Sequence, residues 1–345
     1  MSKPLGLFAL ALSLVSIAFA QGEERLWILN KAAASVSVVD PASGKIECTI
    51  AVGEGPHEAV ISPDGRLMAV SNYGSNAVAG NTVSVIDTTK RQVLRTVDLG
   101  KFDRPHGMAF SPDGRRLFVT AERQKCVSIV TVDDGTVEAR IGTEQSASHM
   151  IVLSADGKRA FVANIGSGSV SVLDLENRSL VKTVPTGAGC EGIALRPGRN
   201  EIWVTNRGAD TLSLISTETL EVTATLPCAS FPIRIAFTPD GARALVSCAK
   251  SDAVAVFSCE ERKEVARIAM PPRESGEKDD EGRLFGNEMG SAVPVGILVH
   301  PEGKVAFVAN TYADRVAVLD LEKLTLRGSL RGGKEPDGLA FSRKP

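Results

Sequence analysis

The chain has 345 residues, of which 43% are hydrophobic, 23% charged and 5% aromatic, and its formal net charge is −2. This composition is typical of a folded globular protein and excludes a disordered chain, a collagen and a bundle of membrane helices. Because 39 Lys and Arg stand against 41 Asp and Glu, no basic excess is available to attract a phosphate backbone, and we expect no nucleic-acid partner.

The first twenty residues have the pattern of a secretory signal peptide. Lys3 precedes an apolar run at residues 5–17, and Ala18-Phe19-Ala20 provides a small-residue cleavage site. The run is shorter than the roughly 20 residues that span a bilayer, which argues against a transmembrane anchor. We therefore expect residues 1–20 to be cleaved and residues 21–345 to lie in the periplasm or outside the cell, with no integral membrane segment.

A four-residue turn recurs along the rest of the chain. Its first copy is Ser62-Pro63-Asp64-Gly65, and most copies follow one another after 42 or 43 residues. Pro presets φ at the second turn position, while Ser and Gly suit the first and the last. The copies begin at Ser62, Ser111, Ser154, Arg196, Thr238, His300 and Ser342.

Each repeated unit predicts four short β-strands. Residues 107–110 and 116–120 flank one turn, and the alternating segments 169–174 and 180–184 are examples of the third and fourth strands. Four antiparallel strands in a unit of this length are the sequence signature of a β-propeller blade. We predict an all-β fold, a single seven-bladed propeller domain over residues 21–345, with a loop insertion at 271–294 and a longer loop at 73–82.

The mature chain begins in the middle of a unit. Its first motif, Trp27-Ile28-Leu29-Asn30, matches second-strand segments such as Trp203-Val204-Thr205-Asn206. Three strands therefore fall between residues 26 and 50, and the missing first strand falls at 337–341. We expect this C-terminal strand to pair with the N-terminal three strands, because that pairing closes the ring and removes exposed edges.

The same motif carries a family resemblance. Trp203-Val204-Thr205-Asn206, followed by Thr211-Leu212-Ser213-Leu214-Ile215, resembles the repeat of the YVTN-type seven-bladed β-propeller proteins, which are mostly exported bacterial and archaeal proteins. The tyrosine of that repeat is replaced here by Trp, Phe, Leu or Ala. The resemblance implies the fold but no single function, because such propellers serve as surface proteins, redox accessories and enzymes, lactonases among them.

Candidate functional residues come from the shared register of the units. The residue five positions before each turn forms one ring around the propeller axis, at one end of the central channel. Three of the four histidines and two carboxylates fall in this ring, whereas His300 lies in a turn at the opposite end. In blade order the ring contains His57, His106, His149, Glu191, Ile233, Val295 and Asp337.

Three interpretations of this ring remain open. Imidazoles at converging positions are ligands for Zn²⁺, Cu²⁺ or Fe²⁺, which makes His57, His106 and His149 candidate metal ligands. The ring also fits a metal-free polar mouth, in which Glu191 and Asp337 bind a ligand together with the histidines. In the third interpretation the histidines only satisfy local hydrogen bonds.

The sequence thus favours an exported binding scaffold that engages a partner protein or a small polar ligand on the loop face, at the channel mouth. The alternative is an enzyme that uses the same histidines, either a metal-assisted, lactonase-like hydrolase or an accessory subunit of a periplasmic redox enzyme. No catalytic residue is assigned, because the chain contains no nucleophile elbow, P-loop, CxxC or HExxH motif.

The six cysteines allow several disulfide arrangements. Cys190, Cys228 and Cys248 map near the loop face of neighbouring blades, and the pattern allows one disulfide among them. Sequence alone assigns no pairing.

Overall fold

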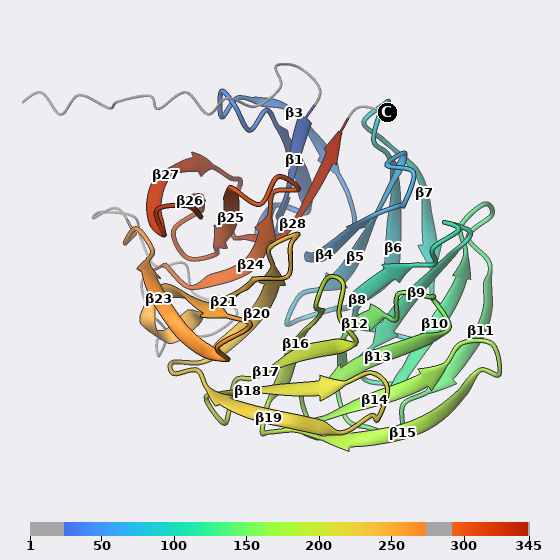
Figure 1. The fold of residues 1–345 in the computed structure, drawn as a ribbon. Coiled ribbons are helices and arrows are strands. Elements are labelled where there is room, and N and C mark those ends of the chain that lie inside the picture. The colour runs from blue at the N-terminus through green and yellow to red at the C-terminus, as the bar shows by residue number, and fades with distance from the viewer. Residues whose placement is uncertain (1–23, 274–291, 344–345) are drawn as a thin grey trace, which may run out of the picture.

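The computed structural model describes residues 24–273 and 292–343. They form seven antiparallel four-stranded sheets around a central axis, together with two single-turn 3-10 helices, η1 (Lys31–Ala33) and η2 (Ala249–Ser251) (Figure 1). The prediction of an all-β, seven-bladed propeller is confirmed. Residues 1–20 and most of the insertion at 271–294 lie outside the described residues. Within the described part, no helix is long and apolar enough to cross a membrane.

In each blade the four strands run up and down from the channel to the rim, and blade 1 is the one that contains both ends of the described chain. The innermost strands of blades 1 to 7 are β28 (Pro336–Arg343), β4 (Pro56–Ile61), β8 (Pro105–Phe110), β12 (Ser148–Leu153), β16 (Cys190–Leu195), β20 (Pro232–Phe237) and β24 (Pro294–Val299). The second strands are β1 (Glu24–Asn30), β5 (Leu67–Gly74), β9 (Arg116–Ala121), β13 (Arg159–Asn164), β17 (Glu201–Asn206), β21 (Arg243–Cys248) and β25 (Val305–Asn310). The third strands are β2 (Ser35–Val39), β6 (Ala79–Asp87), β10 (Cys126–Thr131), β14 (Ser169–Asp174), β18 (Thr211–Ser216), β22 (Ala253–Ser258) and β26 (Arg315–Asp320). The outer strands are β3 (Ile46–Ala51), β7 (Gln92–Asp98), β11 (Val137–Gly142), β15 (Ser179–Pro185), β19 (Val222–Pro227), β23 (Lys263–Ala269) and β27 (Thr325–Arg331).

The ring is closed within blade 1, as the sequence predicts. Strand β28 pairs antiparallel with β1, and Figure 1 shows the red C-terminal strand beside the blue N-terminal one. The indole Nε1 of Trp27 donates a hydrogen bond to Ser342 Oγ at 2.8 Å. Because β28 also contacts the inner strands β24 and β4 of the neighbouring blades, the pairing of the two chain ends holds blade 1 in the ring.

The hydrophobic core lies between neighbouring blades. Trp203 of blade 5, for example, is fully buried and packs edge-on against Phe237 and Phe257 of blade 6, with ring centroids 5.6 and 6.3 Å apart. Burial of such aromatic surface is the main favourable contribution to folding. The packing also fixes the angle at which each inner strand reaches the channel.

The repeated Asn at the end of the second strand has a structural cause. The buried side-chain amide of Asn206 donates to Thr211 Oγ1 and Ser213 Oγ of the third strand, at 3.1 and 2.9 Å. Asn30 makes the equivalent bond to Ser37 at 2.9 Å. Since a buried amide needs partners, the motif recurs as an Asn followed by Ser or Thr at fixed spacing.

Every inner strand contains a β-bulge near its start. In blade 3, Pro105 pairs with Ala121 and Met108 with Val119, so that His106 and Gly107 together oppose Thr120. The inner strands approach closely here, because a Cβ on Gly107 would lie 2.5 Å from the backbone oxygen of His149. Bulges redirect side chains and often occur beside functional sites.

The predicted loop at 73–82 is corrected by the structure. Strand β5 continues to Gly74 and β6 begins at Ala79, and these two residues pair with each other. The tight turn between them is closed by the N–H of Ser75, which donates to the Val78 carbonyl at 2.8 Å. The extra residues therefore lengthen a hairpin, because the alternating pattern of the third strand extends further back than the sequence analysis assumed.

Candidate functional site at the channel mouth

The structure brings the five predicted polar residues together at the starts of five consecutive inner strands. We call the seven equivalent positions the first ring. The ring centroids of His57 and His106 are 4.3 Å apart, and those of His106 and His149 are 3.5 Å apart, so the three imidazoles form a continuous row. The exposed fractions are 5% for His57, 0% for His106, 5% for His149, 3% for Glu191 and 1% for Asp337.

A second ring of residues, which the sequence analysis missed, lies beside the first. Each member directly follows the last residue of the second-strand motif, for example Arg207 after Asn206, and its position could have been read from that motif. Four of the seven are polar residues that contact the first ring or one another. The second ring contains Lys31, Tyr73, Glu122, Ile165, Arg207, Ala249 and Thr311.

The backbone that connects the two rings is the same in all blades. The residue two positions before each first-ring residue has a left-handed φ, and its carbonyl accepts a hydrogen bond from the second-ring N–H. In blade 3, for example, Glu122 N–H donates to Arg104, whose φ is 58°. In blade 7 the left-handed residue is Val293, with φ 51°, a conformation that β-branched residues rarely adopt. Such strain persists only where the surrounding structure fixes it.

A third position supplies an ion pair across the channel. Arg234, one residue beyond the first ring in blade 6, donates from Nε and Nη2 to Glu58 Oε1 of blade 2, at 3.0 and 2.6 Å. Its Nη1 donates to Glu191 Oε1 at 2.9 Å. The sequence analysis missed this pair because it followed only one register position. The position after the first ring is Gly in four blades, so the opposite charges of Glu58 and Arg234 at this position are a sequence signal for an ion pair.

Every buried carboxylate of the first ring has a cationic neighbour. Asp337 Oδ2 lies 2.9 Å from His57 Nδ1 and 3.7 Å from Lys31 Nζ. Glu191 Oε2 lies 2.7 Å from Arg207 Nη1, in addition to its bond from Arg234. Such compensation is required, because an unpaired charge at this depth is strongly unfavourable.

His149 and Glu122 form the tightest contact of the cluster. His149 Nδ1 contacts Glu122 Oε1, and its Nε2 lies 3.5 Å from Glu191 Oε1. Tyr73 donates its hydroxyl to Glu122 Oε2 at 2.6 Å. Glu122 is thus held from two sides, by an imidazole and by a phenol.

The pKa values follow from this arrangement. Burial opposes protonation of His149, but its hydrogen bonds to Glu122 and Glu191 outweigh burial and raise its pKa. Burial acts in the opposite direction on Glu191, where the His149 bond and the Arg207 charge prevail and lower the pKa to about 2. The two carboxylates therefore favour the protonated form of the His149 imidazole, and a metal ion bound by this imidazole would have to displace that proton.

His106 differs from the two histidines beside it. Its side chain is fully buried, and within the described part of the chain neither ring nitrogen has a hydrogen-bond partner. Burial, followed by repulsion from His149 and His57, lowers its pKa well below the usual value. His106 is therefore a neutral imidazole with an unused lone pair, which is the form that binds metals.

Two groups of donor atoms in the described residues converge closely enough to hold a metal ion, each within 4.8 Å. One contains His57, Glu58 and His106, and the other contains His106, Glu122 and His149. Neither combines all three histidines. Metal ligation by the set His57, His106 and His149 remains a prediction.

The remaining first-ring positions are apolar. Ile233 and Val295 pack with Ala249, Val293 and Tyr312 in a buried hydrophobic cluster. The first ring therefore has a polar part in blades 1 to 5 and an apolar part in blades 6 and 7, and Arg234 of blade 6 reaches from the next position into the polar part.

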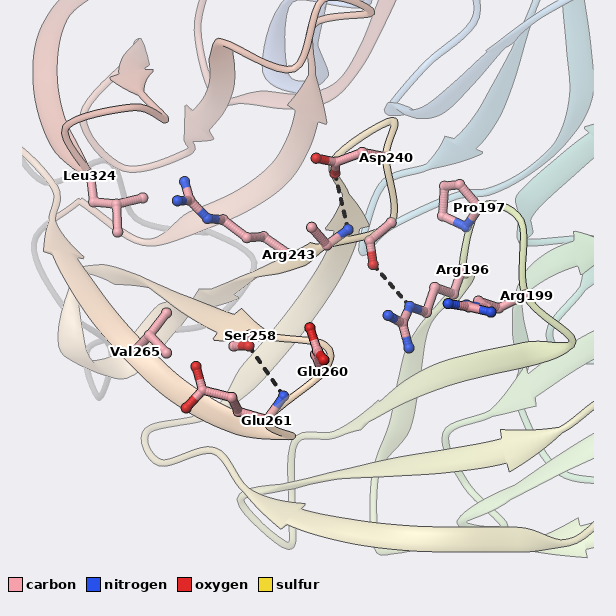
Figure 2. A pocket seen from close by; sticks show the side chains of 12 residues that line it. Arg196, Pro197, Arg199, Asp240, Arg243, Ser258, Glu260, Glu261, Val265 and Leu324 are labelled. Carbon is pink, nitrogen blue, oxygen red and sulfur yellow. Dashed lines mark hydrogen bonds between the residues drawn. The ribbon is translucent and has the colours of Figure 1, made fainter.

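A cleft at the other end of the molecule is unrelated to this cluster. Figure 2 shows it between the turns of blades 5, 6 and 7, with a volume of about 540 Å³. Arg196 donates to the Gly241 carbonyl at 2.9 Å, and Asp240 accepts from Ala242 N–H at 3.0 Å (Figure 2). Because acidic and basic side chains alternate along it, the cleft favours no ligand charge. His300 lies at this end of the molecule, 3.3 Å from Glu24.

The six cysteines are free thiols in the structure. Of the three that map to the loop face, Cys228 and Cys248 are buried together, with their Sγ atoms 3.9 Å apart. Cys228 follows blade 5 and Cys248 ends β21 of blade 6. The geometry therefore narrows the predicted disulfide to this pair.

Comparisons with known proteins place the fold among other propellers. The chain is 25% identical to hydrazine synthase subunit beta of Kuenenia stuttgartiensis over an alignment of 179 residues that covers 40% of this chain and 46% of the relative. It is 25% identical to antigen Lp49 of Leptospira interrogans over 188 residues, which are 52% of this chain and 40% of that protein. The chain thus spans less than half the length of these relatives.

Solved structures extend the likeness to nearly the whole chain. K. stuttgartiensis hydrazine synthase superposes with a TM-score of 0.70 at 20% identity, covering 82% of this chain and 88% of that one. A functionally unknown protein from Desulfotomaculum acetoxidans has a TM-score of 0.75 at 14% identity, covering 93% and 99%. The dihydro-heme d1 dehydrogenase NirN has a TM-score of 0.65 at 14% identity, covering 92% and 74%. At these identities the likeness establishes the fold alone.

A family model describes most of the sequence. The YNCE-like beta-propeller model matches residues 7–159 and 151–276, which together exceed half of the chain. The match supports the propeller repeat inferred from the sequence, but it names a YNCE-like family, which is related to the YVTN-type family of the sequence analysis. The chain belongs to the YNCE-like β-propeller family.

Proposed function

We propose that this chain is an exported binding scaffold that holds a small polar ligand at the channel mouth. The observation that carries the proposal is His106, which is completely buried inside a charged cluster with both ring nitrogens unpartnered in the described structure. Leaving a buried polar group unsatisfied costs about 1–3 kcal/mol. A polar ligand that bonds to His106 removes this cost.

The burial of the cluster supports a small ligand. The five polar first-ring residues are at most 5% exposed, so a bulky molecule could not reach them without opening the mouth. Charges of both signs surround the site, because Lys31, Arg207 and Arg234 pair with the carboxylates of Asp337 and Glu191, and Glu122 pairs with His149. Such a mixed lining suits an ion or a compact polar molecule rather than an apolar one.

Export is supported by the N-terminal pattern of Lys3, an apolar run and Ala18-Phe19-Ala20. We place the mature protein in the periplasm or outside the cell. Mass determination of the N-terminus in secreted material tests this point, and retention of residues 1–20 would contradict it.

A second candidate role is that of a subunit in a redox enzyme. It is favoured by the similarity to a hydrazine synthase subunit and by the shared fold with a heme d1 dehydrogenase. This role predicts that the loop face docks on a cofactor-bearing protein. Cross-linking of the chain in its own cells would then join a loop-face lysine such as the exposed Lys250 to one partner in stoichiometric amount.

The small-ligand function is tested with defined probes. We suggest differential scanning fluorimetry and native mass spectrometry of the purified protein with zinc chloride, cobalt chloride, sodium phosphate and sodium succinate. At least one probe is expected to raise the Tm of the wild type and to add its mass, and His106→Leu should lose this response. Ile233→Leu, at the same ring position in the apolar part, is the matched control and should keep it.

The proposal would be overturned if, with all four probes, the measured mass is that of the protein alone and the Tm is unchanged. Equal responses in His106→Leu and the wild type would also overturn it, because the ligand would then bind elsewhere.

A further inference from the structure

We propose that His106, Glu122 and His149 form a binding site for one divalent first-row transition-metal ion, with Zn²⁺ the best fit. The inference rests on the proposed function, because it assigns a ligand class to the same channel mouth. It differs from the sequence-based ligand set in taking Glu122 of the second ring in place of His57.

The first argument is convergence. One nitrogen of each histidine and one oxygen of Glu122 lie within 4.8 Å of one another, although the residues come from the inner strand β8, from the position after β9 and from the inner strand β12. Two imidazoles and one carboxylate are a common ligand set for zinc, with a further position left for water or substrate. The two bulges aim both histidines at the same point.

The second argument is the unused donor. His106 is 0% exposed and both of its nitrogens lack partners in the described residues. His149 Nε2 makes a long contact of 3.5 Å to Glu191 Oε1. An ion coordinated here would satisfy a buried group that the protein itself leaves unsatisfied.

The third argument is the distribution of charge. Among the described residues, Asp337, Glu58 and Glu191 are each paired with a Lys or Arg. Glu122 has no such partner, and its only ion pair is with His149. It is the carboxylate of the cluster whose charge is available to a metal cation.

The competing donor group is less suitable. Glu58 is occupied by two nitrogens of Arg234, and His57 lies between Asp337 and the Lys31 ammonium, whose Nζ is 3.4 Å from His57 Nε2. A metal ion there would face the Arg234 guanidinium and the Lys31 side-chain nitrogen at short range. The geometry therefore favours Glu122 over His57 as the third ligand.

Neighbouring groups hold the proposed ligands in place. Tyr73 donates to Glu122 Oε2 at 2.6 Å, and Thr120 Oγ1 donates to the backbone oxygen of His149 at 2.6 Å. Outer partners of this kind orient metal ligands, and their loss typically lowers metal affinity about 10- to 100-fold. Tyr73 is therefore a positioning residue in this proposal.

The proposal is tested by metal binding to the metal-stripped protein. In competition with a chromophoric chelator, the wild type should bind one Zn²⁺ per chain, and Glu122→Gln should weaken binding by more than the roughly 100-fold that loss of an outer partner can cause. Tyr73→Phe should weaken it about 10-fold. His57→Gln tests the competing donor group and should bind Zn²⁺ within a few-fold of the wild type, while Ile233→Leu, at the same ring position in the apolar part, is the matched control.

A second measurement uses the wild type alone, so it does not depend on whether the variants fold. X-ray absorption at the zinc edge of the wild type should show two imidazoles with oxygen donors and no sulfur. The inference is overturned if no stoichiometric Zn²⁺ binds, or if His57→Gln abolishes binding while Glu122→Gln does not. If Zn²⁺ fails but phosphate or succinate still raises the Tm, the metal site is wrong while the binding function stands; if every probe fails, both are wrong.

Discussion

The channel mouth consists of two parts built on one backbone. In blades 1 to 5 the first ring presents carboxylates and imidazoles, whereas in blades 6 and 7 the same position holds Ile233 and Val295 in an apolar cluster. The second ring follows this division only in part, because Glu122 and Arg207 are charged and Ala249 joins the apolar cluster, but blade 4 has Ile165 and blade 7 has Thr311. The bulge, the left-handed residue and the connecting hydrogen bond occur in both parts.

This comparison separates structural positions from chemical ones. Since the apolar part keeps the whole backbone frame, neither the bulge nor the left-handed φ requires a polar side chain. Polarity in blades 1 to 5 is therefore not needed to build the propeller, and buried charge is costly where it serves only packing. The proposed functional site is an addition to a repeated fold.

The largest effect is expected at the ring closure in blade 1. This blade lies between apolar blade 7 and the histidines of blades 2 to 4, and its inner strand β28 contains Asp337. Deleting residues 336–345 removes β28, exposes the edge of β1 and should abolish cooperative folding, because the loss exceeds the usual net stability of about 5–15 kcal/mol. Circular dichroism melts provide the measurement, and a deletion variant that still melts like the wild type would contradict ring closure. Ser342→Ala, which loses only the Trp27 bond, should cost about 1 kcal/mol.

Two adjacent residues allow the polar and apolar parts to be compared directly. Arg234→Met leaves Glu58 and Glu191 without their shared cation, and we expect a loss of about 3–5 kcal/mol in unfolding free energy. Ile233→Met changes the neighbouring apolar position with little change in volume and should cost less than about 1.5 kcal/mol. Urea unfolding measures both values.

A double variant identifies the cause of the larger loss. Arg234→Met combined with Glu58→Gln removes one of the uncompensated carboxylates and should recover part of the stability. Equal losses at Arg234 and Ile233, or a double variant less stable than Arg234→Met alone, would show that the ion pair is not what distinguishes the two parts.

The border between blades 5 and 6 offers a smaller effect. Cys228 and Cys248 have Sγ atoms 3.9 Å apart, so thiol–disulfide exchange with a disulfide carrier of an oxidising compartment should join the two blades. Peptide mapping should then show this pair linked, and reduction should lower the unfolding free energy by about 2–4 kcal/mol. A double Ala variant should be insensitive to reductant. Free thiols in protein isolated from that compartment would contradict the linkage.

The sequence carried the fold further than the site, and particular residues show why. The repeat of Ser62-Pro63-Asp64-Gly65 sets the blade number and register, and register alone places His57, His106 and His149 in one row. Glu122 and Arg207 escaped the analysis because they follow the second strand, and only the loop hydrogen bonds bring them beside the first ring. Arg234 reaches Glu58 because the bulge lets a second position of the same strand contribute to the cluster, and the sequence analysis did not use the Gly that occupies this position in four other blades.

The smallest effect is expected for a turn at the end opposite the mouth. A change in this turn should lower stability slightly and leave the polar and apolar parts of the mouth unchanged. Ser111 Oγ donates to Asp113 Oδ1 at 2.5 Å, and this bond, with the Arg115 N–H, lowers the pKa of Asp113 below 3.8. A depressed carboxyl pKa stabilises the fold above the unfolded value and loses that contribution as the pH falls through the folded value. Ser111→Ala should therefore cost about 1 kcal/mol at pH 7, with the difference from wild type shrinking below about pH 4. Urea titrations at neutral and acidic pH measure it. The turn lies at the far end of the inner strand from His106, so probe binding at the mouth should be unaffected. Altered probe binding in Ser111→Ala would mean that the strand couples the two ends of the blade. The polar and apolar parts of the mouth could then not be treated as independent of the rest of the blade.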